Sequence, residues 1–141
     1  MEIEIKEKAV EKITNSEDVA KIFKTILNTE NEIDQDKEHF WTLGIDNANH
    51  IKYIELVSLG ILDSSIVHPR EVFRMAIIKG VAAIIACHNH PSGQVKPSES
   101  DIKTTEKLKA AGEIIGITLL DHVIIGNYKR LNYSFKNDGK L

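Results

Sequence analysis

Apolar and polar residues follow a helical period early in the chain and then give way to strand-like patterns. In residues 16–27, apolar side chains recur every three to four positions behind an acidic first turn, so we predict an amphipathic helix that begins at Ser16. Residues 28–37 are polar and have no period, which favours a connecting loop. Residues 40–45 and 51–59 are rich in β-branched and aromatic side chains and flank a turn-forming stretch, which predicts an antiparallel hairpin.

The middle of the chain predicts a helix followed by a buried strand. Pro69 is typical of a first helical position, and an apolar stripe then runs as far as Gly80, where the helix should end. Residues 81–87 form a short, continuous apolar run, as in a strand that is covered on both faces. This strand would deliver His88 at its carboxyl end.

The last third of the chain predicts one more helix and the rest of a sheet. Pro97 and Ser98 open the helix, and Gly112 is expected to close it. Further apolar segments predict strands or pieces of strands at residues 117–120, 123–125 and 128–134. Together these elements predict an α/β fold in which a mixed β-sheet is flanked by helices.

Length and composition narrow the class of protein. A chain of 141 residues with 42% hydrophobic content can form one domain, which we assign to residues 16–136, between an extension at 1–15 and a frayed tail at 137–141. A formal net charge of −3 gives no general attraction to nucleic acid, so direct contact with DNA is not expected. Cys87 is the only cysteine, which excludes an internal disulfide and fits the reducing cytoplasm.

No segment of the sequence approaches the roughly 18 uninterrupted apolar residues of a membrane span. The first residues also lack the apolar stretch of a signal peptide. We therefore expect no membrane partner, and the sequence leaves open whether the chain forms a homodimer.

The segment after the buried strand carries residues that bind metals. His88 and His90 lie two positions apart, so in extended backbone both imidazoles point to the same side. The loop that follows contains proline and glycine and can turn back, so that Asp101 offers a carboxylate from the first turn of the next helix. Two nitrogens, one oxygen and a water molecule make the open tetrahedral site of a catalytic zinc, although manganese, iron or nickel can occupy the same ligands.

Each of these residues also has an ordinary structural explanation. A histidine at the end of a strand is most often a surface residue. Ser98 and Asp101 match the S-x-x-D pattern of a capping box, which requires no catalysis. The two roles can coexist, because a carboxylate has two oxygens. Zinc nucleobase deaminases are excluded as an alternative, because they need a P-C-x-x-C motif that a single cysteine cannot supply.

The spacing of His88, His90, Ser98 and Asp101 resembles the JAMM signature of the JAB/MPN metalloprotease fold. The surrounding residues 68–72, 88–93 and 120–122 are similar to the RadC branch, bacterial proteins long called DNA repair proteins. The resemblance covers residues 16–134. It implies a cytidine deaminase-like three-layer sandwich, one Zn²⁺ ion, and cleavage of a peptide or isopeptide bond in a peptide or protein substrate.

The resemblance also implies roles for particular residues. Glu38 matches the glutamate that exchanges protons with the zinc-bound water, and Glu71 is the competing candidate. Ser98 would donate a hydrogen bond to the oxyanion. Asn89 stands where deubiquitinating members carry serine, so their substrate does not transfer to this chain. Full-length RadC proteins carry a helix-hairpin-helix module ahead of this domain, which does not fit into the residues before Ser16, and this weakens any link to DNA.

Several other polar residues have assignments that the sequence leaves open. Asp121 and His122 lie between two apolar runs and are candidates for orienting a metal-bound imidazole through the carboxylate, or else they form a purely structural pair. His39, like His50 and His68, is expected at the surface, and Cys87 is expected in the core. The rival to hydrolysis is a binding module with a structural metal or an inactive site, acting in a DNA repair or mobile-element complex.

Overall fold

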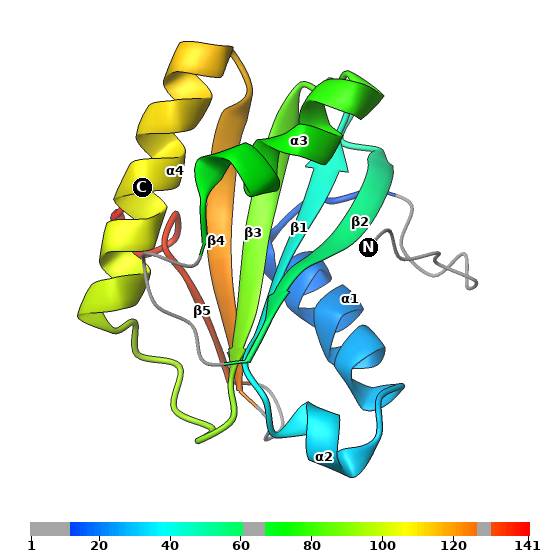
Figure 1. Ribbon diagram of the computed structural model, residues 1–141, viewed down its shortest axis with the longest axis vertical. Coiled ribbons are helices and arrows are strands. Elements are labelled where there is room, and N and C mark those ends of the chain that lie inside the picture. The colour runs from blue at the N-terminus through cyan, green and yellow to red at the C-terminus, as the bar shows by residue number, and fades with distance from the viewer. Residues whose placement is uncertain (1–11, 61–66, 127–130) are drawn as a thin grey trace.

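The computed structural model describes residues 12–60, 67–126 and 131–141 (Figure 1). Within these ranges the chain forms a series of helices and strands in mixed order. The helices are α1 (Ser16–Asn28), α2 (Glu32–Gln35), α3 (Pro69–Lys79) and α4 (Glu99–Ile115). The strands are β1 (His39–Ile45), β2 (Ile51–Leu59), β3 (Ala83–His90), β4 (Thr118–Gly126) and β5 (Asn132–Ser134).

The strands form one mixed sheet in the order β2-β1-β3-β4-β5. β3 and β4 pair in parallel, because α4 connects them as a crossover, and the other neighbours pair antiparallel. β3 therefore lies near the middle of the sheet, and seven of its eight residues are buried. This central position fixes the backbone that carries the histidines.

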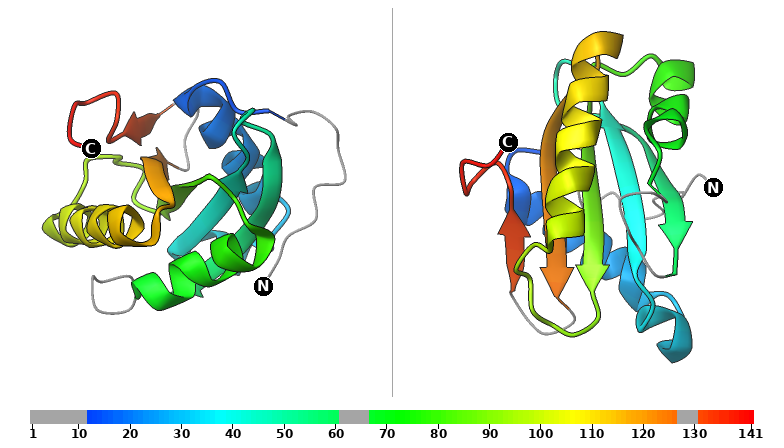
Figure 2. Two further views of the ribbon diagram at one scale, coloured as in Figure 1. Left: turned by 90° about the horizontal axis from the view of Figure 1, so that it is seen from above. Right: turned by 60° about the vertical axis from the view of Figure 1, so that its left-hand side comes forward.

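Helices cover both faces of the sheet (Figure 2). α1 packs on one face, where Phe23 stacks on Trp41 at a ring distance of 5.1 Å. α3 and α4 cover the other face, where Phe73 and Leu108 are fully buried. The layers are helix, sheet and helices, so the expectation of an α/β fold with a mixed sheet flanked by helices is confirmed.

Most predicted elements form, but some boundaries differ. The predicted loop at residues 28–37 contains the short helix α2, which Asn31 caps by accepting a hydrogen bond from the Asp34 N–H. α1 begins at Ser16 as predicted, and it is capped by Asn15, whose side chain accepts from the Asp18 N–H at 3.0 Å.

Gly112 does not end the third long helix. α4 continues to Ile115 and ends at Gly116, which has a left-handed φ of 86°. A Cβ on Gly112 would lie 2.4 Å from the carbonyl oxygen of Ile117. The glycine is therefore required by close packing of the backbone and not by helix termination.

The two predicted strand pieces at residues 117–120 and 123–125 belong to one strand, β4, in which Asp121 and His122 are internal. The predicted segment 128–134 is observed as β5 from Asn132, while 127–130 lie outside the described residues, as do 1–11 of the predicted extension.

The predicted frayed tail is wrong, because its backbone is hydrogen-bonded in a turn. The Asp138 N–H donates to the Ser134 carbonyl at 3.1 Å, and the Lys140 N–H donates to the Phe135 carbonyl at 2.8 Å. The Asn137 side chain also donates to the Ser16 hydroxyl at 2.9 Å. The first two bonds fold the tail back on the end of β5, and the third attaches it to the start of α1.

In the described parts of the chain, no helix combines the length and the apolar composition that crossing a bilayer requires.

Candidate metal centre

β3 presents two imidazoles on the face of the sheet that α3 and α4 cover. Its residues alternate between the faces, so His88 and His90 share the face of Ile84 and Ala86, whereas Cys87 lies in the core on the α1 side. His88 is fully buried, and His90 is partly exposed. The strand thus holds one histidine inside the protein and one at the edge of a pocket.

Asp101 reaches the histidines from the first turn of α4. The capping box is formed in full, since the Asp101 N–H donates to Ser98 Oγ at 3.1 Å and the Ser98 N–H donates to Asp101 Oδ2 at 2.8 Å. The same carboxylate faces both imidazoles. Capping therefore orients Asp101 toward the histidines, and the two explanations of this pair hold together. The Ser98 hydroxyl itself makes the cap, and its hydrogen remains available for donation.

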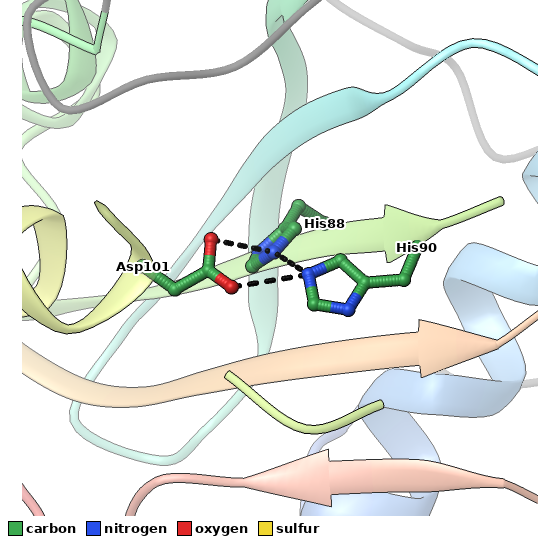
Figure 3. A group of neighbouring side chains, drawn as sticks. All are labelled: His88, His90 and Asp101. Atoms are coloured by element: carbon green, nitrogen blue, oxygen red, sulfur yellow. Dashed lines mark hydrogen bonds and ion pairs between the residues drawn. The ribbon is translucent and has the colours of Figure 1, made fainter. Parts of the chain in front are cut away.

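The three side chains converge through one atom of each imidazole and the two carboxylate oxygens (Figure 3). The two Nε2 atoms lie 2.9 Å apart; Asp101 Oδ1 is 3.1 Å from His88 Nε2, and Oδ2 is 3.0 Å from His90 Nε2. Ligand atoms at about 2.0–2.1 Å from a tetrahedral zinc lie about 3.3 Å from one another. The spacing thus fits a single ion, and this group could hold a metal.

Hydrogen bonds fix the imidazole of His90 in the form that binds metals. His90 Nδ1 lies 2.8 Å from the carbonyl oxygen of Gln94, which can only accept, so Nδ1 carries the hydrogen. In the neutral ring, Nε2 then has a free lone pair, and it points toward Asp101 and His88.

A chain of buried hydrogen bonds fixes the tautomer of His88, again with the hydrogen on Nδ1. The Thr105 hydroxyl donates to the Asp101 carbonyl at 2.8 Å, so its oxygen accepts from His122 Nδ1 at 2.6 Å. His122 Nε2 therefore accepts from His88 Nδ1 at 2.7 Å. This order leaves the Nε2 lone pair of His88 facing the Nε2 lone pair of His90. Two acceptors at this distance repel unless a proton or a metal ion lies between them, so the arrangement is compatible with a metal site.

The charges around the site agree with this assignment. Burial acts to raise the pKa of Asp101, but when a proton and not a metal occupies the site, hydrogen bonds from the imidazole Nε2 atoms of His88 and His90 outweigh burial and hold that pKa far below its usual range. Burial lowers the pKa of His122 well below its usual value, so this imidazole is neutral. For His90, burial opposes protonation, but the bonds to Asp101 and Gln94 raise its pKa. Without a metal, the raised pKa of His90 and the lowered pKa of Asp101 favour a proton on the imidazole of His90.

An open pocket of about 650 Å³ adjoins the group. Its walls come from the segment before β1, the end of β2, the loop after β3 and the start of α4. The lining residues are Asp36, Lys37, Glu38, Gly60, His90, Pro91, Ser92, Ser98 and Asp101. The pocket therefore brings Glu38 and Ser98 to the open side of the three ligands, and the negative charge of Glu38 contributes to the raised pKa of His90.

Glu71 lies elsewhere. It is in the first turn of α3, exposed, 3.8 Å from Arg70 Nε and 3.9 Å from Arg74 Nε. It is not among the described residues that line the pocket. This geometry favours Glu38 over Glu71 as the acid–base candidate.

Asp121 and His122 have separate environments although they are adjacent. Asp121 accepts hydrogen bonds from the Ser134 hydroxyl at 2.6 Å and from the Lys136 N–H at 3.0 Å, on the opposite face from the ligands. Only His122 touches a ligand, and it does so through its own ring and not through a carboxylate. The aspartate stabilises the joint between β4 and β5.

Two residues of this region differ from the sequence interpretation. His39 is fully buried, which contradicts its expected surface position: it stacks on Trp41, its Nδ1 lies 2.8 Å from the Lys37 carbonyl, and its Nε2 contacts Glu30. Thr105 was not identified, although it follows Asp101 by four residues and so lies on the same side of the helix.

Comparison with known proteins identifies the family. The sequence profile described as "RadC-like JAB domain" matches residues 13–140. The chain belongs to this RadC-like JAB family. A UPF0758 protein of Desulforudis audaxviator is 53% identical over 94 residues, covering 67% of this chain and 41% of that protein. UPF0758 proteins of Methanosarcina acetivorans and Listeria monocytogenes are 49% and 48% identical over 106 and 100 residues, which cover 75% and 71% of this chain.

These alignments span less than half of each relative, 45% for the latter two. The profile match includes all the candidate residues from Glu38 to Asp121 and His122. The chain is therefore a RadC-like JAB domain that carries a candidate His-His-Asp metal group.

Proposed function

We propose that this chain is a zinc-dependent peptidase or isopeptidase of JAMM type. The observation that carries the proposal is the convergence of His88, His90 and Asp101 at the wall of an open pocket that also contains Glu38. Imidazole and carboxylate ligands suit the borderline character of zinc, and manganese or iron are the competing ions. A ligand set closed by a fourth protein residue would favour a structural metal instead, and no fourth His, Cys, Asp or Glu joins the group among the described residues.

A zinc ion held there would supply Lewis acidity, activating water at neutral pH and polarising the carbonyl group of the scissile bond. The residues of the chain would do the rest. Glu38 would take up a proton from the attacking water and deliver it to the leaving amine. Ser98 would donate its hydroxyl hydrogen to the developing negative charge on the carbonyl oxygen, since its oxygen is already occupied by the cap of α4.

A pocket of this openness suits an extended peptide better than an enclosed small molecule. We therefore propose a peptide or protein substrate.

The first test combines metal analysis with cleavage assays. The purified chain should contain about one equivalent of zinc, and it should cleave members of a library of peptides and isopeptides in a manner that a chelator abolishes and zinc restores. Glu38→Gln should keep the zinc and lose turnover, whereas the matched variant Glu71→Gln should keep both. Loss of turnover in Glu71→Gln with full activity in Glu38→Gln would refute the assignment of the acid–base residue.

Ser98→Ala tests the oxyanion role, and because it also removes the side-chain cap of α4, its zinc content is measured alongside turnover. Removal of one oxyanion donor typically lowers the turnover number by about 100- to 1,000-fold, so we expect slow but measurable cleavage. The alternative is a structural metal in a binding module. It would be indicated if the zinc-loaded chain cleaved no member of the library and if Glu38→Gln changed neither its stability nor its binding to DNA or protein.

A further inference from the structure

The pocket opens where the backbones of β1 and β3 separate. Their antiparallel register runs from Ile45 and Ala83 to Phe40 and His88, and no pair follows. If the register continued, the next residue opposite Asn89 would be His39, and the residue opposite His90 would be Glu38. The candidate acid–base residue therefore lies across from a metal ligand, beyond the last rung of the ladder.

The side chain of Asn89 replaces the missing rung. Asn89 is fully buried, its Oδ1 accepts from the His39 N–H at 2.6 Å, and its Nδ2 donates to the Lys37 carbonyl at 3.0 Å. Those two groups belong to the peptide units on either side of Glu38. A third bond, from the Gly60 N–H to the Glu38 carbonyl at 2.9 Å, holds the same backbone from β2. The backbone of Glu38 is thus fixed relative to β3 by one amide side chain.

Alternation explains why this arrangement aims Glu38 at the metal group. Asn89 lies between the two ligands on β3 and points to the opposite face of the sheet, where it meets the backbone before β1. His39 points to that same face and stacks on Trp41, so its neighbour Glu38 faces the pocket. β3 therefore supplies the two histidines on one face of the sheet. On the other face it supplies Asn89, which holds the backbone of Glu38.

We infer that Asn89 is a positioning residue that sets the distance between Glu38 and the metal. This inference rests on the proposed function and adds to it a residue that touches neither the metal nor the substrate. An amide is required because the bridge needs one acceptor and one donor in a planar fork. Aspartate keeps the acceptor but cannot donate, and alanine loses both.

The first experiment measures the bridge without any metal. Amide hydrogen exchange followed by NMR should show the His39 N–H exchanging about tenfold faster or more in Asn89→Ala, relative to an amide at the centre of β1 such as Leu43. Asn89→Asp should keep much of the protection at His39. Asn47→Ala, the same change in the exposed β1–β2 turn at the other end of the sheet, should alter neither amide. Unchanged exchange at His39 in Asn89→Ala would refute the bridge.

The second experiment measures what the bridge does. Cobalt(II) replaces zinc and gives a visible spectrum whose pH dependence responds to nearby charge. Glu38→Gln removes a negative charge and should lower the midpoint of this titration. Asn89→Ala should lower it in the same direction while cobalt affinity changes little, because His88 and His90 keep their bonds to His122 and Gln94.

The double variant decides the inference. If Asn89 acts through Glu38, Glu38→Gln with Asn89→Ala should shift the midpoint no further than Glu38→Gln alone. Additive shifts, or no shift in Glu38→Gln, would overturn it. A wild-type chain that binds no cobalt would instead overturn the proposed function, and the exchange experiment would still decide whether Asn89 holds the backbone of Glu38.

Discussion

Replacing Thr105 with valine tests whether hydrogen-bond direction, and not only ligand placement, prepares the metal group. Valine has nearly the shape of threonine, so the change removes a buried hydroxyl and little else. His122 Nδ1 then loses its acceptor. If the Nδ1 hydrogen stays, an unpaired buried N–H costs about 1–3 kcal/mol of folding free energy. If it moves to Nε2, the hydrogen of His88 must move to its own Nε2, where the metal should bind.

The first response lowers the stability of the protein and the second lowers its zinc affinity, and both quantities can be measured. Loss of a group that orients a metal ligand typically lowers affinity by 10- to 100-fold, which is about 1.4–2.7 kcal/mol. Zinc affinity is measured by competition with a chromophoric chelator, and stability by urea unfolding of the metal-free protein. Thr105→Ser keeps the hydroxyl and should restore most of the affinity. If Thr105→Val binds zinc within about threefold of the wild type, the assignment of the His88 tautomer through His122 is wrong.

Further predictions concern the ligands and the buried thiol. Asp101→Asn keeps an acceptor for the cap of α4 but should not retain stoichiometric zinc; helical circular dichroism should be unchanged, and full zinc content in the purified variant would count against the proposed ligand set. The raised pKa of His90 means that protons compete with the metal, so zinc affinity should fall as the pH drops through the folded-state pKa of His90, which lies above 6.5. In the metal-free protein the sign is opposite: the stability contributed by protonated His90 is fully present below pH 6.5 and is lost as the pH rises through the folded-state pKa. Zinc titrations and urea unfolding at several pH values measure the two trends, and a pH-independent zinc affinity would contradict the first. Burial raises the pKa of the Cys87 thiol, so a disulfide reagent at pH 8 should label it only at the rate of unfolding, and rapid labelling of the native protein would show that the strand is less protected than described.

The convergence of the candidate ligands could be predicted from the sequence because the features that position them are local. Two histidines in one strand share a face by alternation, and Asp101 is aimed by a capping box whose pattern is readable over four residues. The helix starts and the hairpin were likewise visible in short windows.

The orienting contacts could not be predicted, because they join segments that are far apart in the sequence. His39 is buried by Trp41 and Glu30, and Thr105 is important only because β4 brings His122 to it. Gly112 shows the same limit in another form. A glycine near the end of a helical pattern normally indicates a cap, yet here the constraint comes from the backbone of the following strand.

The metal group and the Asn89 bridge close over different lengths of chain. His90 and Asp101 are 11 residues apart, whereas the Asn89 bridge closes over 52 residues to Lys37. By the logarithmic dependence of loop closure on length, the longer closure costs roughly 1.4 kcal/mol more in chain entropy. If the chain is the metallohydrolase proposed above, loosening of the amino-terminal half would therefore disturb Glu38 while leaving the metal group, which closes locally, in place.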